Sequence, residues 1–131
     1  MKILLFGGRG QIGWELQRAL SAFGDLVVVD RQKADFENSS RIEAVVEAEA
    51  PNIVVNAAAY TAVDRAETDF HKARLVNAVG VERLAHAAFA QKALLIHYST
   101  DYVYDGLKTL AYHKSDPTNF RLTPRGNLCG W

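Results

Sequence analysis

Residues 1 to 13 read Met1-Lys2-Ile3-Leu4-Leu5-Phe6-Gly7-Gly8-Arg9-Gly10-Gln11-Ile12-Gly13, and this stretch predicts the fold of the chain. The apolar run that ends at Phe6 has the length and composition of a fully buried strand. Glycines follow at positions 7, 10 and 13, and a segment of helical periodicity runs from Gln11 to Phe23. A strand that passes through glycines directly into a helix is typical of a parallel α/β sheet.

Three further apolar stretches of strand length follow, at 26–30, 53–57 and 94–97, and helix-period segments lie between them. Ser40-Arg41-Ile42-Glu43 has the spacing of a capping box, which predicts a helix start before the third strand. Continuous apolar strands that alternate with helices predict a doubly wound parallel sheet covered on both faces. Right-handed crossovers favour the strand order 3-2-1-4, the N-terminal half of a Rossmann fold.

The glycine loop is a candidate phosphate-binding site. Its G-x-x-G-x-x-G spacing puts Gly7 at the sharp turn, Gly10 where backbone amides meet a pyrophosphate, and Gly13 where the helix packs on the sheet. A helix that starts near Gln11 adds free amides and its positive end. A glycine-rich structural turn is the alternative. We nevertheless expect a dinucleotide cofactor, because the loop joins a first strand to a helix and precedes a strand that ends in an acid.

The acid that ends the second strand is Asp30, whose carboxylate can accept hydrogen bonds from ribose hydroxyls or serve as an ordinary polar strand end. Arg31 offers a partner for a 2′-phosphate, so the choice between NADH and NADPH stays open. Asp35 and Phe36 are candidate adenine contacts, Phe36 by packing and Asp35 by accepting from the amino group. For Asp35 a solvated loop position fits nearly as well.

The third and fourth strands also end in unusual segments, and ligands of open α/β sheets bind beyond such strand ends. Ala57, Ala58 and Ala59 follow the third strand and are small enough for a cofactor to lie close to the backbone, although alanines also favour helices. Ser99-Thr100-Asp101-Tyr102 follows the fourth strand and offers hydroxyls and a carboxylate to a polar substrate. A capping turn is the alternative there.

Composition narrows the class of function. The chain has 131 residues with 15 basic and 15 acidic side chains, so it has no electrostatic footprint for nucleic acid or membranes. Its single cysteine, Cys129, favours a reducing, cytoplasmic compartment. No stretch approaches the roughly 20 apolar residues of a membrane span. None of the histidines has metal-ligand spacing, so we predict no metal site.

Three motifs resemble the dTDP-4-dehydrorhamnose reductase family of extended short-chain dehydrogenases. They are the glycine loop with residues 14–16, the segment Val55-Asn56-Ala57-Ala58-Ala59-Tyr60-Thr61-Ala62-Val63-Asp64, and the segment His97-Tyr98-Ser99-Thr100-Asp101-Tyr102-Val103-Tyr104. The resemblance implies NAD(P)H-dependent reduction of dTDP-4-dehydro-6-deoxy-L-mannose to dTDP-L-rhamnose, for surface polysaccharide such as lipopolysaccharide O-antigen. It also implies an NAD(P)-binding Rossmann domain over residues 1–119, a dTDP-sugar substrate, and a homodimer in full-length members.

The resemblance assigns roles to single positions. Gly10, Gln11 and Ile12 match the pyrophosphate loop. Thr100 and Asp101 match the substrate-contacting pair, in which Thr100 donates a hydrogen bond to the keto oxygen. The other matching cofactor contacts are Asp30, Asp35, Phe36, Ala59, Tyr60, Thr61 and Tyr98.

One feature departs from the family, which uses a tyrosine as proton donor and a lysine four residues later. By the family's spacing the pair belongs near positions 124 and 128, where this chain has Pro124 and Leu128. We expect none of Tyr102, Tyr104 and Tyr112 to replace the tyrosine. The chain is therefore expected to have little activity alone.

We expect the last residues, 120–131, to lie outside the resemblance. Codons exist for residues 120–123 that read Pro-Leu-Asn after a shift of two bases, and the family commonly has Pro-Leu-Asn at this point. We therefore expect a truncated or frameshifted form of the reductase. The alternative is a non-catalytic dinucleotide-binding or regulatory subunit related to it.

Overall fold

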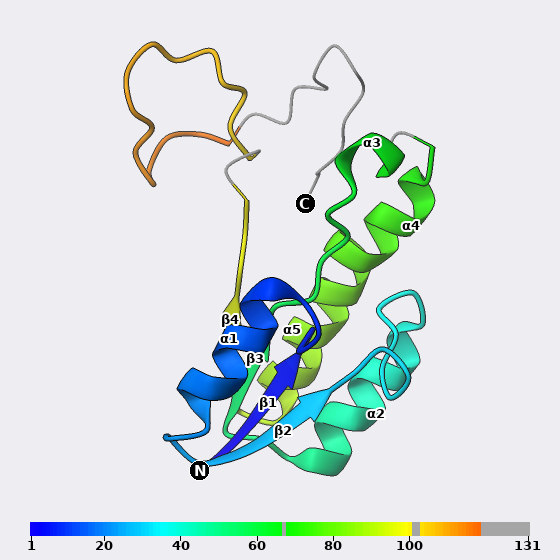
Figure 1. Ribbon diagram of the computed structural model, residues 1–131. Coiled ribbons are helices and arrows are strands. Elements are labelled where there is room, and N and C mark those ends of the chain that lie inside the picture. Colours follow the sequence, from blue (N-terminus) through cyan, green and yellow to red (C-terminus); the bar gives the residue numbers. More distant parts are fainter. Residues whose placement is uncertain (67, 101–102, 119–131) are drawn as a thin grey trace.

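The computed structural model describes residues 1–66, 68–100 and 103–118, and Figure 1 shows a sheet with helices on both faces. The strands are β1 (Lys2–Phe6), β2 (Asp25–Val29), β3 (Ile53–Asn56) and β4 (Leu94–His97). All neighbours pair in parallel, and Leu4 of β1 lies opposite Val27 of β2 and Val54 of β3. The predicted doubly wound parallel sheet is confirmed.

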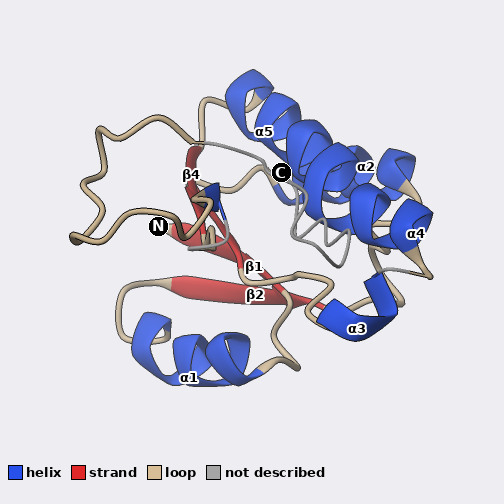
Figure 2. Ribbon diagram, turned by 90° about the horizontal axis from the view of Figure 1, so that it is seen from above, coloured by secondary structure: helices blue, strands red, loops and turns tan. Residues whose placement is uncertain are grey.

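The predicted strand order is wrong, because the observed order is β2-β1-β3-β4 rather than 3-2-1-4. Helix α1 (Gln11–Leu20) covers one face, whereas α2 (Ser39–Glu49) lies on the other beside α5 (Gly80–Ala90) (Figure 2). A right-handed crossover through the opposite face moves the next strand in the opposite direction. Strand β3 therefore returns to the far side of β1, which puts the topological switch point between β1 and β3.

The predicted capping box is also wrong. Helix α2 begins at Ser39, and Asn38 at the N-cap makes no side-chain capping bond. The hydroxyl of Ser40 instead donates to Oδ1 of Asn38 at 2.8 Å. Because Ser40 already lies inside the helix, its spacing to Glu43 has no capping role.

The segment between β3 and β4 contains a short helix followed by a longer, continuous one. It comprises α3 (Val63–Ala66), α4 (Phe70–Arg74), the π-helix η1 (Leu75–Val79) and α5. The last three are continuous, so η1 is a π-helical turn inside a longer helix. Such turns are frequent at functional sites.

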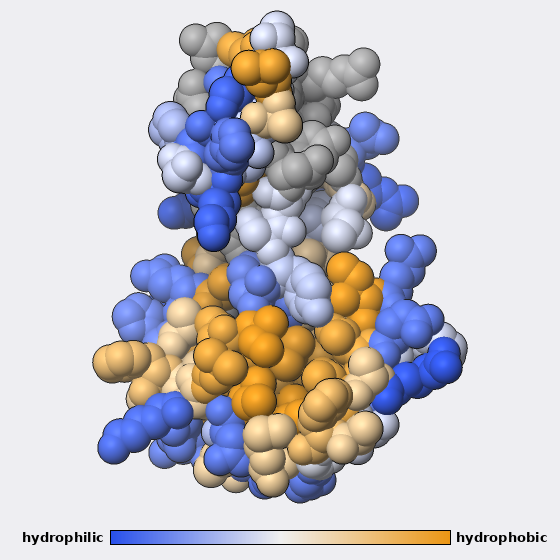
Figure 3. Space-filling view, turned by 90° about the vertical axis from the view of Figure 1, so that its left-hand side faces the viewer, coloured by the Kyte–Doolittle hydropathy of each residue, from blue (hydrophilic) through white to orange (hydrophobic). Residues whose placement is uncertain are grey.

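The core lies in two layers, one on each face of the sheet. The larger layer, under α2 and α5, contains the buried residues Leu4, Phe6, Val29, Ala34, Phe36, Ile42, Val46, Val54, Leu84 and Ala88. The smaller layer, under α1, contains the buried residues Ile3, Leu5 and Val55. Figure 3 views the molecule from the side of α1 and β4 and shows a broad hydrophobic area on this surface.

The described helices include none that is long and apolar enough to cross a lipid bilayer.

Candidate functional site

The site begins where the ends of β1 and β3 touch. Gly7 has φ of +80°, a conformation that residues with a Cβ rarely adopt. A Cβ on Gly7 would lie 2.4 Å from the backbone nitrogen of Ala58 and 2.5 Å from the carbonyl carbon of Ala57. The predicted turn at Gly7 is therefore also a backbone-to-backbone contact across the switch point of the sheet.

Helix α1 starts directly beyond this contact. Gly10 is its N-cap and supplies no side chain to its first amides, so those of Gln11 and Ile12 have neither a helical partner nor a side-chain cap. Gly13 is buried, and a Cβ there would lie 2.1 Å from the carbonyl oxygen of Gly7. The helix is thus packed on the loop with its positive end and free amides at the cleft, as an anion site requires.

Two adjoining pockets open along the carboxyl ends of the strands. The first is lined by sixteen residues, of which Gly7, Gly10, Asp30, Arg31, Asp35, Phe36, Ala57, Ala58, Ala59 and Tyr60 were predicted cofactor contacts. The second is lined by Arg9, Gly10, Gln11, Ile12, Asn56, Ala57, Ala58, Ala59, Tyr60, Thr61, Asn77, Tyr98, Ser99 and Thr100. The fold therefore brings the predicted residues together, except Gly13 beneath the loop and Asp101, which lies outside the described residues.

Asp30 stands at the end of β2 with its carboxylate fixed by the backbone. Its Oδ1 accepts from the amides of Gln32 at 3.0 Å and Lys33 at 3.1 Å. Its Oδ2 lies 3.4 Å from the guanidinium of Arg9, which is a weak, exposed contact. One carboxylate oxygen therefore remains largely available to a hydroxyl donor at the rim of the first pocket.

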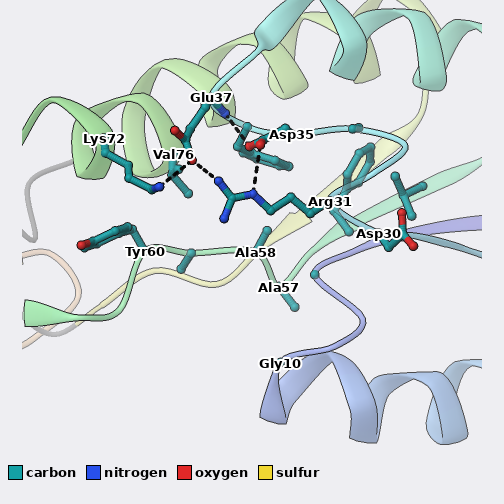
Figure 4. Close-up of a pocket in the computed structure, with 16 residues that line it drawn as sticks. Gly10, Asp30, Arg31, Asp35, Glu37, Ala57, Ala58, Tyr60, Lys72 and Val76 are labelled. Atoms are coloured by element: carbon teal, nitrogen blue, oxygen red, sulfur yellow. Dashed lines mark hydrogen bonds and ion pairs between the residues drawn. The ribbon is translucent and has the colours of Figure 1, made fainter. Parts of the chain in front are cut away.

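Arg31 has the opposite arrangement, since two of the three nitrogens of its guanidinium are engaged with carboxylates. Its Nε donates to Oδ2 of Asp35 at 2.9 Å, and its terminal nitrogen is paired with Glu37. Lys72 from α4 is paired with the same Oε1 of Glu37 at 3.0 Å. Figure 4 shows these four side chains along one wall of the pocket, with Arg31 directed toward Glu37 and away from Asp30.

These contacts shift the pKa of both partners. The hydrogen bond and charge of Asp35 raise the pKa of Arg31. Partial burial alone would raise the pKa of Asp35, but the Glu37 amide, Arg31 and Lys72 outweigh it and lower that pKa. Asp35 is therefore ionised at neutral pH, and an adenine amino group would share its oxygens with Arg31 and an amide.

Phe36 lines the first pocket. It is buried, and its ring meets that of Phe6 edge to face with centroids 5.7 Å apart. This packing fixes the position of the ring, and the small side chains of Ala57 and Ala58 line the same pocket. Apolar lining residues with a few polar groups beside them are typical of sites that bind small ligands.

The chain matches the model of the RmlD substrate binding domain over residues 1–124. The chain belongs to the RmlD substrate binding domain family. It is 48% identical over 118 residues to a dTDP-4-dehydrorhamnose reductase of Burkholderia thailandensis, covering 90% of this chain and 40% of that enzyme. The resemblance inferred from the three motifs is thereby confirmed.

Solved structures agree with this membership in the RmlD family. A dTDP-4-dehydrorhamnose reductase of Clostridium acetobutylicum superposes with a TM-score of 0.86 at 37% identity, over 91% of this chain and 43% of that one. The Bacillus anthracis reductase in complex with NADP gives 0.84 at 33% identity, over 89% and 42%. The chain thus spans about two fifths of the length of the RmlD-type reductases that it matches.

Within this RmlD-type domain, two buried asparagines hold the segment after β3 that lines both pockets, a role that was not predicted from the sequence. Asn77 in η1 accepts from the amide of Tyr60 at 2.8 Å and donates to the carbonyl of Tyr60 at 3.0 Å. Asn56 accepts from the amide of Ala58 at 3.0 Å. A polar residue inside an apolar helical run was the available signal for Asn77.

Tyr104 does have a lysine four residues later, Lys108, so an expectation that no tyrosine here has the family's spacing to a lysine is wrong. The structure gives this pair no place in the RmlD-type cleft. The Tyr104 ring stacks on Tyr112 with centroids 4.4 Å apart, and Lys108 pairs with Asp116. Neither lines the two cleft pockets, and the turns of this loop cannot hold them on one helix face. Tyr102 lies outside the described residues.

Tyr60 is the tyrosine that faces both pockets, and its environment opposes proton release. Its hydroxyl donates to Oδ2 of Asp69 at 3.0 Å. Burial together with this hydrogen bond and the charge of Asp69 raises the pKa of Tyr60. The family's proton donor needs a lowered pKa, so Tyr60 does not match it.

Proposed function

We propose that this chain is the nucleotide-binding part of a dTDP-4-dehydrorhamnose reductase of the cytoplasm. The domain spans residues 1–119, binds NADH or NADPH, and contributes to reduction of dTDP-4-dehydro-6-deoxy-L-mannose to dTDP-L-rhamnose. In the complete enzyme it belongs to a homodimer. The observation that carries the proposal is the convergence of the Gly7–Gly13 loop, Asp30 and Thr100 on one cleft at the switch point of the sheet.

The described residues fit a dinucleotide. The uncapped amides of Gln11 and Ile12 suit its pyrophosphate, and Gly7 packs directly on the backbone of Ala57 and Ala58, which line both pockets. Asp30 suits the adenosine ribose, and Phe36 suits the adenine. Bound NAD(P)H supplies the hydride of the reaction.

The second pocket is where the chain would orient the keto sugar. The hydroxyl of Thr100 is proposed to donate to the keto oxygen, where negative charge develops during reduction. Tyr98 and Thr61 line the same pocket and are proposed to contact the nicotinamide half of the cofactor. Asp101, the other proposed substrate contact, lies outside the described residues.

We propose that the chain by itself still binds the nucleotide but reduces the substrate slowly or not at all. The cleft tyrosines Tyr60 and Tyr98 are followed four residues later by Asp64 and Tyr102, so neither has the lysine partner. General acid catalysis is typically worth 10²- to 10⁴-fold. This observation also favours the second candidate, a dinucleotide-binding subunit without catalysis.

Calorimetric titration of NADH and NADPH into Gly10→Val tests the glycine loop. A Cβ at Gly10 meets only the Gly7 carbonyl oxygen, at 3.4 Å, so the protein tolerates it while a pyrophosphate does not. We expect at least about tenfold weaker binding, equivalent to one lost charge-assisted hydrogen bond. Ala44→Val, on the exposed side of α2, is the matched control. If Gly10→Val binds as well as the unaltered chain, the loop is only a turn.

An assay with the 4-keto sugar nucleotide tests the second half of the proposal. We expect binding without turnover at a typical enzyme rate, which is about 10 s⁻¹. Turnover near that rate would show that another residue supplies the proton, and the assignment of the missing tyrosine would be wrong.

A further inference from the structure

The wall of the first pocket shares one carboxylate between two cations. Oε1 of Glu37 is paired with both Arg31 and Lys72, and Asp35 takes the Nε of Arg31. Figure 4 shows both cations turned toward Glu37. All four side chains line the pocket that the adenosine half of a dinucleotide would occupy.

The ribose end of the same pocket presents an anion instead. Asp30 lies at the tip of β2 with Oδ1 held by two backbone amides. A ribose with two free hydroxyls can donate to such a carboxylate. A 2′-phosphate has lost most of its protons at neutral pH, adds a charge of about −1.5 to −2, and is repelled by Asp30.

We infer that Glu37 gives this site its preference for a dinucleotide without a 2′-phosphate, by holding Arg31 and Lys72 away from the ribose. This inference rests on the proposed nucleotide-binding function. To pair with a 2′-phosphate through two of its nitrogens, Arg31 would have to give up at least one of these carboxylates, so the new ion pair replaces an existing one. The free-hydroxyl form needs no such exchange.

Arg9 is the remaining cation beside Asp30. It is 3.4 Å from Oδ2 of Asp30, and its side chain is 80% exposed. An exposed, flexible side chain gains little from one ion pair, because ordering it and stripping its water offset the attraction. We therefore expect Arg9 to contribute little to binding of a 2′-phosphate while Arg31 is held by Asp35 and Glu37.

Glu37→Gln is the decisive variant, since glutamine keeps the shape and removes the charge that holds both cations. Binding of NADH and NADPH is measured by calorimetry for each protein, with thermal unfolding as a check of folding. The unaltered chain is expected to bind NADH about tenfold more tightly than NADPH. In Glu37→Gln this ratio should fall by about tenfold, mainly through tighter NADPH binding, which corresponds to one regained charge-assisted hydrogen bond.

Two further variants keep the test interpretable. Glu43→Gln removes a surface carboxylate paired with Arg83 at 3.3 Å, outside the nucleotide pockets, and should leave the ratio unchanged. Lys72→Met removes one of the two cations that share Glu37, so Glu37 pairs with Arg31 alone. This variant should keep or increase the preference for NADH. The opposite directions of Glu37→Gln and Lys72→Met separate a specific effect from a general loss of structure.

The outcomes distinguish this inference from the function on which it rests. Equal or tighter binding of NADPH by the unaltered chain overturns the inference, as does an unchanged ratio in a folded Glu37→Gln. In either case the proposed function stands, because a nucleotide still binds. If neither nucleotide binds any of the proteins, the proposed function fails and the inference fails with it.

Discussion

The two faces of the sheet are built from alternate residues of the same strands, yet they are covered very differently. Under α2 and α5, helices span the sheet from β2 to β4 and enclose Leu4, Val54 and Leu84 completely. Under α1, one helix covers the region of β1 and β2 and encloses far fewer side chains. Alternation along β4 makes the contrast direct, because Leu95 packs into the larger layer while Leu94 and Ile96 point the other way.

The exposed side of β4 shows the consequence. Leu94 is 59% exposed and Ile96 is 41% exposed, at a sheet edge where the described residues supply no further strand. Exposed apolar side chains beside an open edge promote association of chains. We expect stability to reside mainly in the α2–α5 face and self-association to start at the α1 face.

The strongest test of this contrast compares two leucine truncations. Leu84→Ala, at a fully buried position, should lower the free energy of unfolding by about 2–5 kcal/mol, because it leaves a cavity. Leu94→Ala, at an exposed position, should lower it by less than about 1 kcal/mol. Urea unfolding measures both. Similar losses would mean that the two faces contribute equally.

A second test concerns how α1 is held on its face. In Gly13→Ala the new Cβ would lie 2.1 Å from the Gly7 carbonyl oxygen, so the helix must move, at about 1–3 kcal/mol. In Gly10→Ala the Cβ would lie 3.4 Å from that same oxygen, and the change should stay within about 0.5 kcal/mol. Thermal unfolding of the pair measures the difference. Equal melting temperatures would show that α1 is loosely seated.

A third, smaller effect concerns pH and His97 at the end of β4. Burial lowers the pKa of His97 below its ordinary value of 6.5, more than its hydrogen bond with Asn56 raises it. The unfolded chain then takes up the proton first, so stability is complete above pH 6.5 and declines as the pH falls through the folded-state pKa. Urea unfolding between pH 8 and 5 should show this decline, and His97→Gln should flatten it. An identical slope in both would exclude His97 as the cause.

The smallest effect on stability is expected for Leu94→Lys with Ile96→Lys. Because both side chains are already exposed, the free energy of unfolding should change by no more than about 0.5 kcal/mol. Light scattering at rising concentration should nevertheless show less association, since two charges then flank the open edge. If the doubly substituted protein associates as strongly as the unaltered chain, the surface that causes association lies elsewhere.

Much of the fold could be predicted, because the signals are local. Apolar runs identified all four strands, and the spacing of Gly7, Gly10 and Gly13 identified the turn into α1. Strand order could not be predicted in this way. It depends on which face α2 covers, and the residues of α2 are compatible with packing on either side.

The candidate site likewise contains residues that could be predicted from the sequence and residues that could not. Residues at strand ends, such as Asp30 and Thr100, could be predicted because parallel strands bring their carboxyl ends together. Glu37, Lys72 and Asn77 were not predicted, because they reach the cleft from a turn and from helices whose approach depends on tertiary packing. The Tyr104–Lys108 spacing shows the converse, since a matching interval means little where the chain forms no helix.

The close approach at Gly7 also limits how this sequence can change over time. A side chain at Gly8 would meet Cγ1 of Val28 at 2.4 Å, so a smaller residue at position 28 could make room for it. A side chain at Gly7 would instead meet the backbone of Ala57 and Ala58, and every amino acid carries those atoms. No substitution at position 57 or 58 can therefore relieve the clash of a side chain at position 7. A protein in which Gly7 has been substituted can recover the contact by returning to glycine.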